Sequence, residues 1–179
     1  MITALALLGG VAEARTDRGT GRANYAVFND VAREVRRYVN YTIFDDVNAS
    51  VEDGTVTLTG VVTMPFKKDD IGRRVARVAG VNTVRNLITA LPVSNFDDEL
   101  RYKIARAIYA NPNFWNYAAM ANPPIHIVVE RGRVTLSGVV FSDVDRMLAR
   151  SLASSWGALS VTNALKTDAE VREQLERID

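Results

Sequence analysis

VEDGTVTLTGVV, at residues 51–62, recurs as VERGRVTLSGVV at residues 129–140, and nine of the twelve positions are identical. Each copy holds a turn signal, Asp-Gly in the first and Arg-Gly in the second, followed by a run in which apolar and polar residues alternate. Alternation with a period of two behind a glycine-containing turn is typical of a half-buried β-hairpin. Self-similarity at a fixed offset indicates repeated units, so the sequence predicts two small domains, each built on one hairpin.

The composition is that of an ordinary folded protein, with 47 % hydrophobic and 24 % charged residues. A net charge of +1 is far below the basic excess of typical nucleic-acid-binding domains, so we expect no nucleic-acid partner. The absence of cysteine excludes disulfides, thiolate metal sites and cysteine nucleophiles. No apolar run reaches the roughly 20 residues of a transmembrane helix, and we expect no transmembrane span.

Residues 1–26 are predicted to form an N-terminal leader or arm. Residues 1–11 are apolar, and the Ala-Glu-Ala at residues 12–14 fits the small-residue pattern of a signal-peptide cleavage site. The basic start that such a signal usually carries is missing, so an uncleaved arm is the alternative. Residues 15–25 are rich in glycine and charge, which indicates an arm or linker.

The first predicted domain, residues 27–92, follows the order helix, strand, strand, helix, strand. We expect its strands at residues 47–51, 55–62 and 81–91, and its helices to begin near Phe28 and Pro65. Gly80 is expected to end the second helix. Helical spacing predicts these side chains in the core: Phe28, Val31, Val35, Tyr38, Val39, Phe66, Ile71, Val75 and Val78.

The second predicted domain, residues 93–167, repeats that order. Asn95 is expected to cap its first helix, and the strands are expected at residues 125–130, 134–140 and 159–166. The side chains predicted to face its core from the two helices are Leu100, Ile104, Ile108, Val144, Met147, Leu148 and Leu152. Residues 168–179 should contain a further, docked helix.

Two stretches are candidate contact sites. The second domain carries an insertion at residues 111–124, NPNFWNYAAMANPP, which the first domain lacks. This insertion either covers the local core or contacts a partner chain or bilayer interface through Phe114, Trp115, Tyr117 and Met120. The other stretch is the helix that begins at Pro65, which is either a solvated surface or a face for lipid phosphates. Its basic residues are Lys67, Lys68, Arg73, Arg74 and Arg77.

The doubled pattern resembles the BON domain, a bacterial osmotic-stress and nodulation family. The residues that carry the resemblance follow G-x-V-x-L-[ST]-G-x-V and G-[VA]-x-x-V-x-N. Among them, the structural motif residues are Gly54, Gly60, Gly80 and Asn86 in the first copy, and Gly132, Gly138, Gly157 and Asn163 in the second. The resemblance implies an α+β fold of two tandem α-β-β-α-β units, each a three-stranded sheet with two helices on one face. It also implies a bacterial protein that is periplasmic, outer-membrane-associated or extracellular.

Catalysis has little support in the sequence. The single histidine, His126, belongs to an alternating strand pattern that predicts a surface position, and no nucleophile motif accompanies it. The resemblance implies a non-catalytic module without a cofactor or metal, whose partner is phospholipid or another envelope component. The alternative is a structural protein that assembles into a homo-oligomer or filament through its sheet edges, the aromatic insertion and the N-terminal arm.

Overall fold

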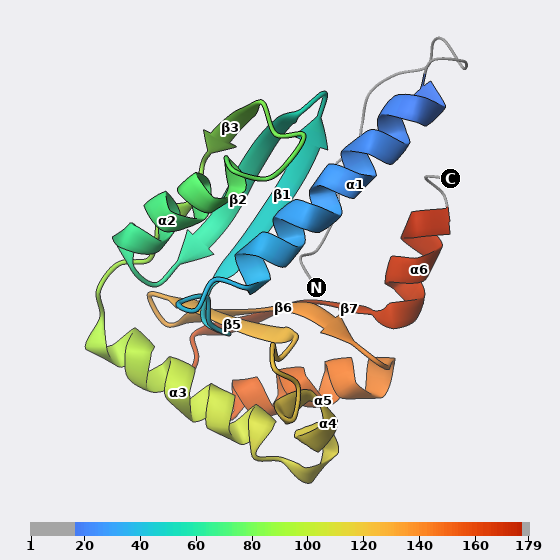
Figure 1. The fold of residues 1–179 in the computed structure, drawn as a ribbon. Helices are drawn as coiled ribbons and strands as arrows, with labels where there is room; N and C mark the ends of the chain where they lie inside the picture. The colour runs from blue at the N-terminus through green and yellow to red at the C-terminus, as the bar shows by residue number, and fades with distance from the viewer. Residues whose placement is uncertain (1–16, 177–179) are drawn as a thin grey trace. The chain divides into compact units, whose positions relative to one another are not determined.

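The structure is a computed structural model that describes residues 17–176 (Figure 1). Within that range the chain forms two compact units. The first unit contains residues 17–41 and 47–90, and the second contains residues 42–46 and 91–176. Both are α+β units with a mixed sheet, as predicted. The apolar residues 1–11 and the predicted cleavage site lie outside the described residues.

The first unit begins with helix α1 (Asp17–Arg36), which starts inside the stretch predicted to be a linker. That prediction was wrong, because extending an already nucleated helix adds one hydrogen bond per residue and tolerates isolated glycines. Strands β1 (Asp46–Glu52) and β2 (Thr55–Val62) form the hairpin. Helix α2 (Pro65–Val75) follows, with Pro65 in its first turn as predicted.

The third predicted strand, residues 81–91, is present as two short strands, β3 (Thr83–Asn86) and β4 (Thr89–Ala90). Both pair in parallel with β2. Asn86 is the last residue of β3, and its side chain makes two hydrogen bonds. Its Nδ2 donates to the backbone oxygen of Lys68 at 2.8 Å, and its Oδ1 accepts from the backbone nitrogen of Ile88 at 3.2 Å. Asn86 therefore ties α2 to the sheet.

The core of the first unit lies between its two helices and one face of the sheet. Its buried members include Val31, Val35, Val56, Leu58, Ile71 and Val75. Two predicted core residues are exposed instead. Val39 lies beyond the last residue of α1, where helical spacing no longer applies, and Phe66 occupies the first turn of α2 on its outer side.

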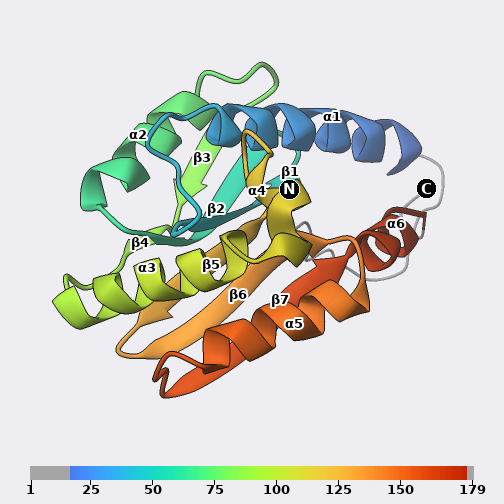
Figure 2. The same cartoon turned by 90° about the horizontal axis from the view of Figure 1, so that it is seen from below.

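The second unit contains α3 (Asn95–Tyr109), the 3₁₀ turn η1 (Pro112–Phe114), α4 (Trp115–Ala118), β5 (Ile125–Glu130) and β6 (Arg133–Val140). It continues with α5 (Asp143–Ser154), β7 (Ser160–Thr167) and α6 (Asp168–Glu176). β6 pairs antiparallel with β5 and parallel with β7. Figure 2 shows α3 and α5 running along the same face of this sheet.

Helix α3 begins differently from the prediction, because Ser94 rather than Asn95 is the N-cap. The Ser94 hydroxyl accepts from the backbone nitrogen of Asp97 at 3.2 Å. The Asp97 carboxylate is buried and accepts from the backbone nitrogens of Arg131 and Gly132, both at 2.8 Å. One side chain thus joins the first turn of α3 to the turn of the β5–β6 hairpin.

Helix α5 presents a different face to the core from the one predicted. Val144 and Met147 are 66 % and 63 % exposed, so their prediction as core residues was wrong. Ala149 and Ala153 are fully buried instead, with Leu148 and Leu152 partly buried beside them. The helix carries apolar residues on two sides, and the sequence periodicity did not distinguish the buried side from the exposed one.

The motif residues have equivalent roles in both units. The hairpin turns place Gly54 and Gly132 at φ 75°, and the strands that follow place Gly60 and Gly138 at φ 110° and 111°. At Gly138 an added Cβ would lie 1.8 Å from the backbone oxygen of Pro124, so only glycine fits. Asn163 repeats the bonds of Asn86, since its Nδ2 donates to the backbone oxygen of Arg146 at 2.8 Å. Gly80 and Gly157 also have positive φ, but both helices end before them. Helix α2 ends at Val75 with Ala76 as its C-cap, so the prediction that Gly80 ends this helix was wrong. Helix α5 likewise ends at Ser154, with Ser155 as its C-cap.

Candidate functional site

The predicted basic residues of α2 do not form one exposed face. Lys67 is buried, and its Nζ donates to the Thr63 hydroxyl at 2.7 Å. Arg73 pairs with Asp70 on the same helix. Arg74 pairs with Glu34 of α1 at 2.6 Å. Lys68 and Arg77 have no ion-pair partner among the described residues, so two of the five predicted cations are paired with carboxylates within the unit and one is buried.

The aromatic insertion divides into a buried part and an exposed part. Phe114 and Tyr117 lie in the core of the second unit, which corrects their prediction as contact residues. The Tyr117 hydroxyl donates to Asp145 Oδ2 and accepts from the backbone nitrogen of Phe141, each at 2.7 Å. Burial raises the pKa of Tyr117. Trp115, 65 % exposed, and Met120 remain accessible for a contact.

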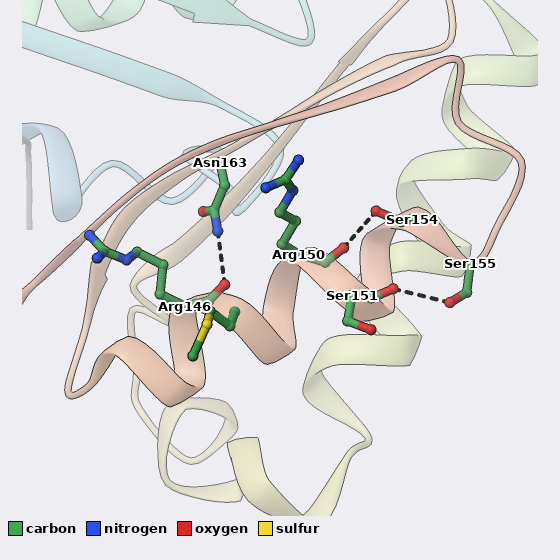
Figure 3. Close-up of a pocket in the computed structure, with 7 residues that line it drawn as sticks. Arg146, Arg150, Ser151, Ser154, Ser155 and Asn163 are labelled. Atoms are coloured by element: carbon green, nitrogen blue, oxygen red, sulfur yellow. Dashed lines mark hydrogen bonds between the residues drawn. The ribbon is translucent and has the colours of Figure 1, made fainter.

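An open groove with a volume of about 760 Å³ follows helix α5 in the second unit (Figure 3). Helix α5 and the residue after it supply most of its lining, and one residue comes from β7. The lining residues are Arg146, Met147, Arg150, Ser151, Ser154, Ser155 and Asn163. Figure 3 shows the hydroxyls of Ser154 and Ser155 bonded one helical turn back, to the backbone oxygens of Arg150 and Ser151. The groove therefore combines cations, hydroxyl groups and a thioether.

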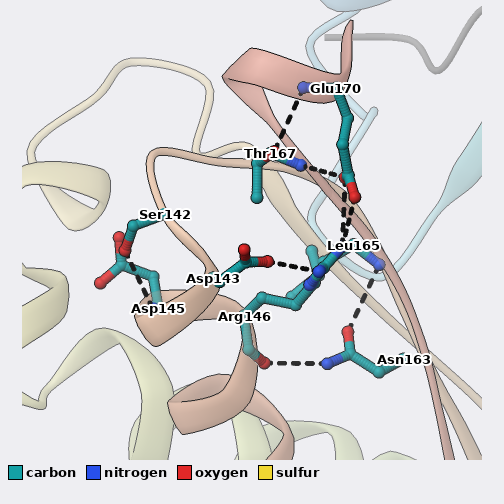
Figure 4. Close-up of polar contacts among 8 residues, drawn as sticks. All are labelled: Ser142, Asp143, Asp145, Arg146, Asn163, Leu165, Thr167 and Glu170. Atoms are coloured by element: carbon teal, nitrogen blue, oxygen red, sulfur yellow. Dashed lines mark hydrogen bonds and ion pairs between the residues drawn. The ribbon is translucent and has the colours of Figure 1, made fainter.

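Arg146 is held by acidic side chains on two helices (Figure 4). Its guanidinium donates to both carboxylate oxygens of Glu170 in α6, at 2.9 and 3.1 Å, and also pairs with Asp143. The bond to Glu170 raises the pKa of Arg146. The hydrogen bond from the backbone nitrogen of Thr167 lowers the pKa of Glu170, and the hydrogen bond from Arg146 lowers it to a smaller extent. Arg146 is therefore neutralised locally, and Arg150 has no ion-pair partner among the described residues.

Exposed apolar side chains flank this groove. Val144 and Met147 occupy the outer side of α5, and Phe141 is exposed just before the helix begins. Phe141 also stacks on Tyr117, with ring centroids 4.6 Å apart. We define the α5 face as the surface formed by Phe141, Val144, Met147, Arg150, Ser151, Ser154 and Ser155. Our sequence interpretation missed it, although one cation and three serines at helical spacing after Ser142 were a usable signal.

The single histidine, His126, lies in the interior of the second unit. His126 is only 9 % exposed, which corrects its prediction as a surface residue, and burial lowers its pKa. Its Nδ1 lies 2.6 Å from the backbone oxygen of Asp45, which belongs to the same unit. Within residues 17–176, no three His, Cys, Asp or Glu side chains gather closely enough to hold a metal ion. Among the helices of the same range, none combines the length and apolarity needed to cross a membrane.

Comparison with protein families gives two matches to the same family model, described as the BON domain, at residues 29–92 and 96–169. No curated protein matches the chain. One similar solved structure is of CdsD, a structural protein of the type III secretion system of Chlamydia trachomatis. It is 12 % identical with a TM-score of 0.29, over 84 % of this chain and 97 % of that one. Another, of the CdsD C-terminal domain, has the same identity and TM-score over 76 % of this chain and 94 % of that one.

Proposed function

Since this chain belongs to the BON domain family, we propose that it is a non-catalytic binding module of the bacterial cell envelope that recognises anionic phospholipid. The family is of the binding type, and its members are envelope-associated. We assign the lipid contact to the α5 face of the second unit. The observation that carries this proposal is the exposure of Val144 and Met147 on the same helix as the unpaired Arg150.

The α5 face has the chemistry that a bilayer interface requires. Val144, Met147 and Phe141 would leave water for the acyl boundary, which is favourable by about 25 cal/mol per Å² of apolar surface buried. Arg150 would meet lipid phosphates, and juxtamembrane cations gain about 1 kcal/mol each from an anionic leaflet. Trp115 belongs to the same short helix as Tyr117, which stacks on Phe141. The amphipathic ring of Trp115 suits the headgroup region of a bilayer beside the α5 face.

Self-assembly through sheet edges, the aromatic insertion and the N-terminal arm is the alternative function. The aromatic insertion is one of the surfaces on which that hypothesis depends, and its Trp115 and Met120 side chains are exposed and accessible to another chain. The start of the arm lies outside the described residues. No described contact favours assembly over lipid binding, and the proposal for lipid therefore comes first.

Vesicle co-sedimentation tests the proposal. The wild-type chain should bind phosphatidylglycerol vesicles in a salt-sensitive manner and bind phosphatidylcholine vesicles weakly. A Val144→Ser/Met147→Ser double variant should bind the anionic vesicles at least about tenfold more weakly, because each buried apolar side chain contributes about 1.5–3 kcal/mol. Arg150→Glu should also weaken binding, whereas Arg106→Glu, the same charge change on an exposed part of α3, should have a smaller effect.

Two results would overturn this function. Equal losses in the α5 variants and in Arg106→Glu would show that charge alone, and not the α5 face, drives adsorption. A wild-type chain that ignores vesicles but sediments as a large particle without lipid would favour the assembly alternative. Circular dichroism of each variant checks that the fold is unchanged.

A further inference from the structure

The first unit has a separate groove, about 590 Å³ in volume, between helices α1 and α2. The lipid proposal does not use it. Helix α1 and the residues after it line one wall, and α2 with the residues after it lines the other. Five arginines lie along the groove: Arg33, Arg37, Arg73, Arg74 and Arg77. Three acidic residues, Asp30, Glu34 and Asp70, also line it, so its formal charge is +2, five cations less three anions.

Three of the arginines are already paired. Arg33 contacts Asp30 at 2.8 Å, Arg74 contacts Glu34 at 2.6 Å, and Arg73 pairs with Asp70. The positive charge that remains belongs to Arg37 and Arg77. Both are exposed, and neither has an ion-pair partner among the described residues. These two guanidinium groups are therefore available to an anionic ligand.

The cross-helix contacts show how the two arginines are arranged. Glu34 pairs with Arg74, and one turn later on α1 the Tyr38 hydroxyl donates to Asp70 at 2.5 Å, one turn earlier on α2. The helices therefore run antiparallel. Arg37 lies toward the Asp70 end of the groove, and Arg77 lies toward the end near Asp30. The backbone positions of these two arginines thus lie toward opposite ends of the groove, roughly two helical turns or 10 Å apart along the helix axes.

The middle of the groove is fixed. The Arg74 guanidinium lies 5.1 Å from the centre of the Tyr38 ring while it pairs with Glu34. The hydrogen bond from Tyr38 lowers the pKa of Asp70, so that carboxylate stays ionised and holds both Tyr38 and Arg73. A ligand would meet walls that are already organised, with arginines that lack an ion-pair partner among the described residues at the two ends.

We propose that the α1–α2 groove binds a ligand with two phosphate groups, one held by Arg37 and the other by Arg77. Guanidinium groups recognise phosphate through paired charge-assisted hydrogen bonds, and two such groups at opposite ends select for a ligand with two anionic ends. The charged lining disfavours an apolar ligand. The same chemistry could come from a bisphosphate headgroup such as cardiolipin or from a free sugar bisphosphate.

Isothermal titration with fructose 1,6-bisphosphate tests the site without a membrane. The wild-type chain should bind this probe, and glucose 6-phosphate should bind about tenfold more weakly, because one charge-assisted contact is lost. Arg37→Ala and Arg77→Ala should each reduce bisphosphate affinity to near the monophosphate level. Arg85→Ala, an exposed arginine of the same unit outside the groove, should bind like the wild type.

Vesicles distinguish the two sources of the ligand. Binding to cardiolipin vesicles that exceeds binding to phosphatidylglycerol vesicles of equal charge, and that Arg37→Ala/Arg77→Ala removes, identifies a lipid headgroup. Binding of the soluble probe without that preference identifies a free bisphosphate. Equal affinity for monophosphate and bisphosphate, or an equal loss in Arg85→Ala, overturns the site. The Val144→Ser/Met147→Ser variant should bind the soluble probe normally, so this inference and the lipid proposal fail separately.

Discussion

Helices α2 and α5 occupy the same place in their units but fill their cores differently. The two hairpin copies start at residues 51 and 129, and the same offset of 78 places Ile71 opposite Ala149 and Val75 opposite Ala153. All four residues are fully buried. The second unit therefore has two small side chains where the first unit has two large ones.

The aromatic insertion adds two large side chains to this core. Phe114 and Tyr117 are the largest fully buried side chains of the described residues, and they belong to the same core cluster as Ala149 and Ala153. Because interiors are close-packed, a core that loses two branched side chains must gain volume from elsewhere. The insertion is therefore in part a core element, whereas the exposed apolar residues Val144 and Met147 of α5 lie outside the core.

The largest test of this comparison is at Gly138, where the end of the insertion abuts β6. Gly138→Ala would place a Cβ against the Pro124 carbonyl at positive φ, so we expect a loss above about 4 kcal/mol, or failure of the second unit to fold. Gly157→Ala has open space around it and should lose only about 1–2 kcal/mol from its positive φ. Urea denaturation measures both, and similar losses would show that the insertion can move aside.

The second test separates the two parts of the insertion. Phe114→Ala should cost about 3–5 kcal/mol of unfolding free energy, because it removes a buried ring and leaves a cavity. Trp115→Ala, one residue further along the chain, should stay within about 0.5 kcal/mol, because that side chain is exposed. Thermal or urea denaturation gives both values. A large loss for Trp115→Ala alone would mean that the exposed ring, not the buried one, holds the insertion in place.

A third, smaller effect tests whether the volumes compensate for each other. Ala149→Ile restores the side chain of the first unit and should cost about 1–3 kcal/mol in the wild-type core, because Ala149 is fully buried and larger side chains overpack a close-packed interior. In a Phe114→Ala background the same change should cost less, with a coupling of about 0.5–3 kcal/mol. A double-mutant cycle measures this coupling. Additive losses would mean that Phe114 and Ala149 fill unrelated parts of the core.

The smallest effect concerns α6, which follows β7 and for which the first unit shows no equivalent among its described residues. The pKa of Glu170 is lowered from its ordinary value of 4.5 by the Thr167 backbone nitrogen and by Arg146. The ionised Glu170 side chain stabilises the fold at pH values above its pKa in the unfolded chain. This stabilisation is lost as the pH falls through the lower pKa that Glu170 has in the folded chain. The protection factors of the α6 amides, which correct for the intrinsic pH dependence of exchange, should therefore fall below about pH 4.5. Glu170→Gln should remove this pH dependence, whereas Glu173→Gln should retain it.

The hairpins could be predicted from the sequence because turn chemistry and a period of two are local signals. Residues 55–62 form β2 as expected, and the order of elements follows from repetition. The core face of α5 could not be predicted, because the helix carries apolar residues on both its buried and its exposed sides, and local periodicity does not rank them. The α1–α2 groove was hidden for a different reason. Arg37 and Arg77 are forty residues apart, and only the packing of two helices brings them to one surface.

The carboxylate of Asp97 has a consequence for the dynamics of the second hairpin. A hairpin tip usually frays, and its amide protons exchange quickly with solvent. Here the amides of Arg131 and Gly132 are bound by a buried side chain from the start of α3. Their exchange should report the opening of that helix end rather than the fraying of a surface turn. In native-state hydrogen exchange these two amides should be protected together and lose protection together when Asp97 is replaced by alanine.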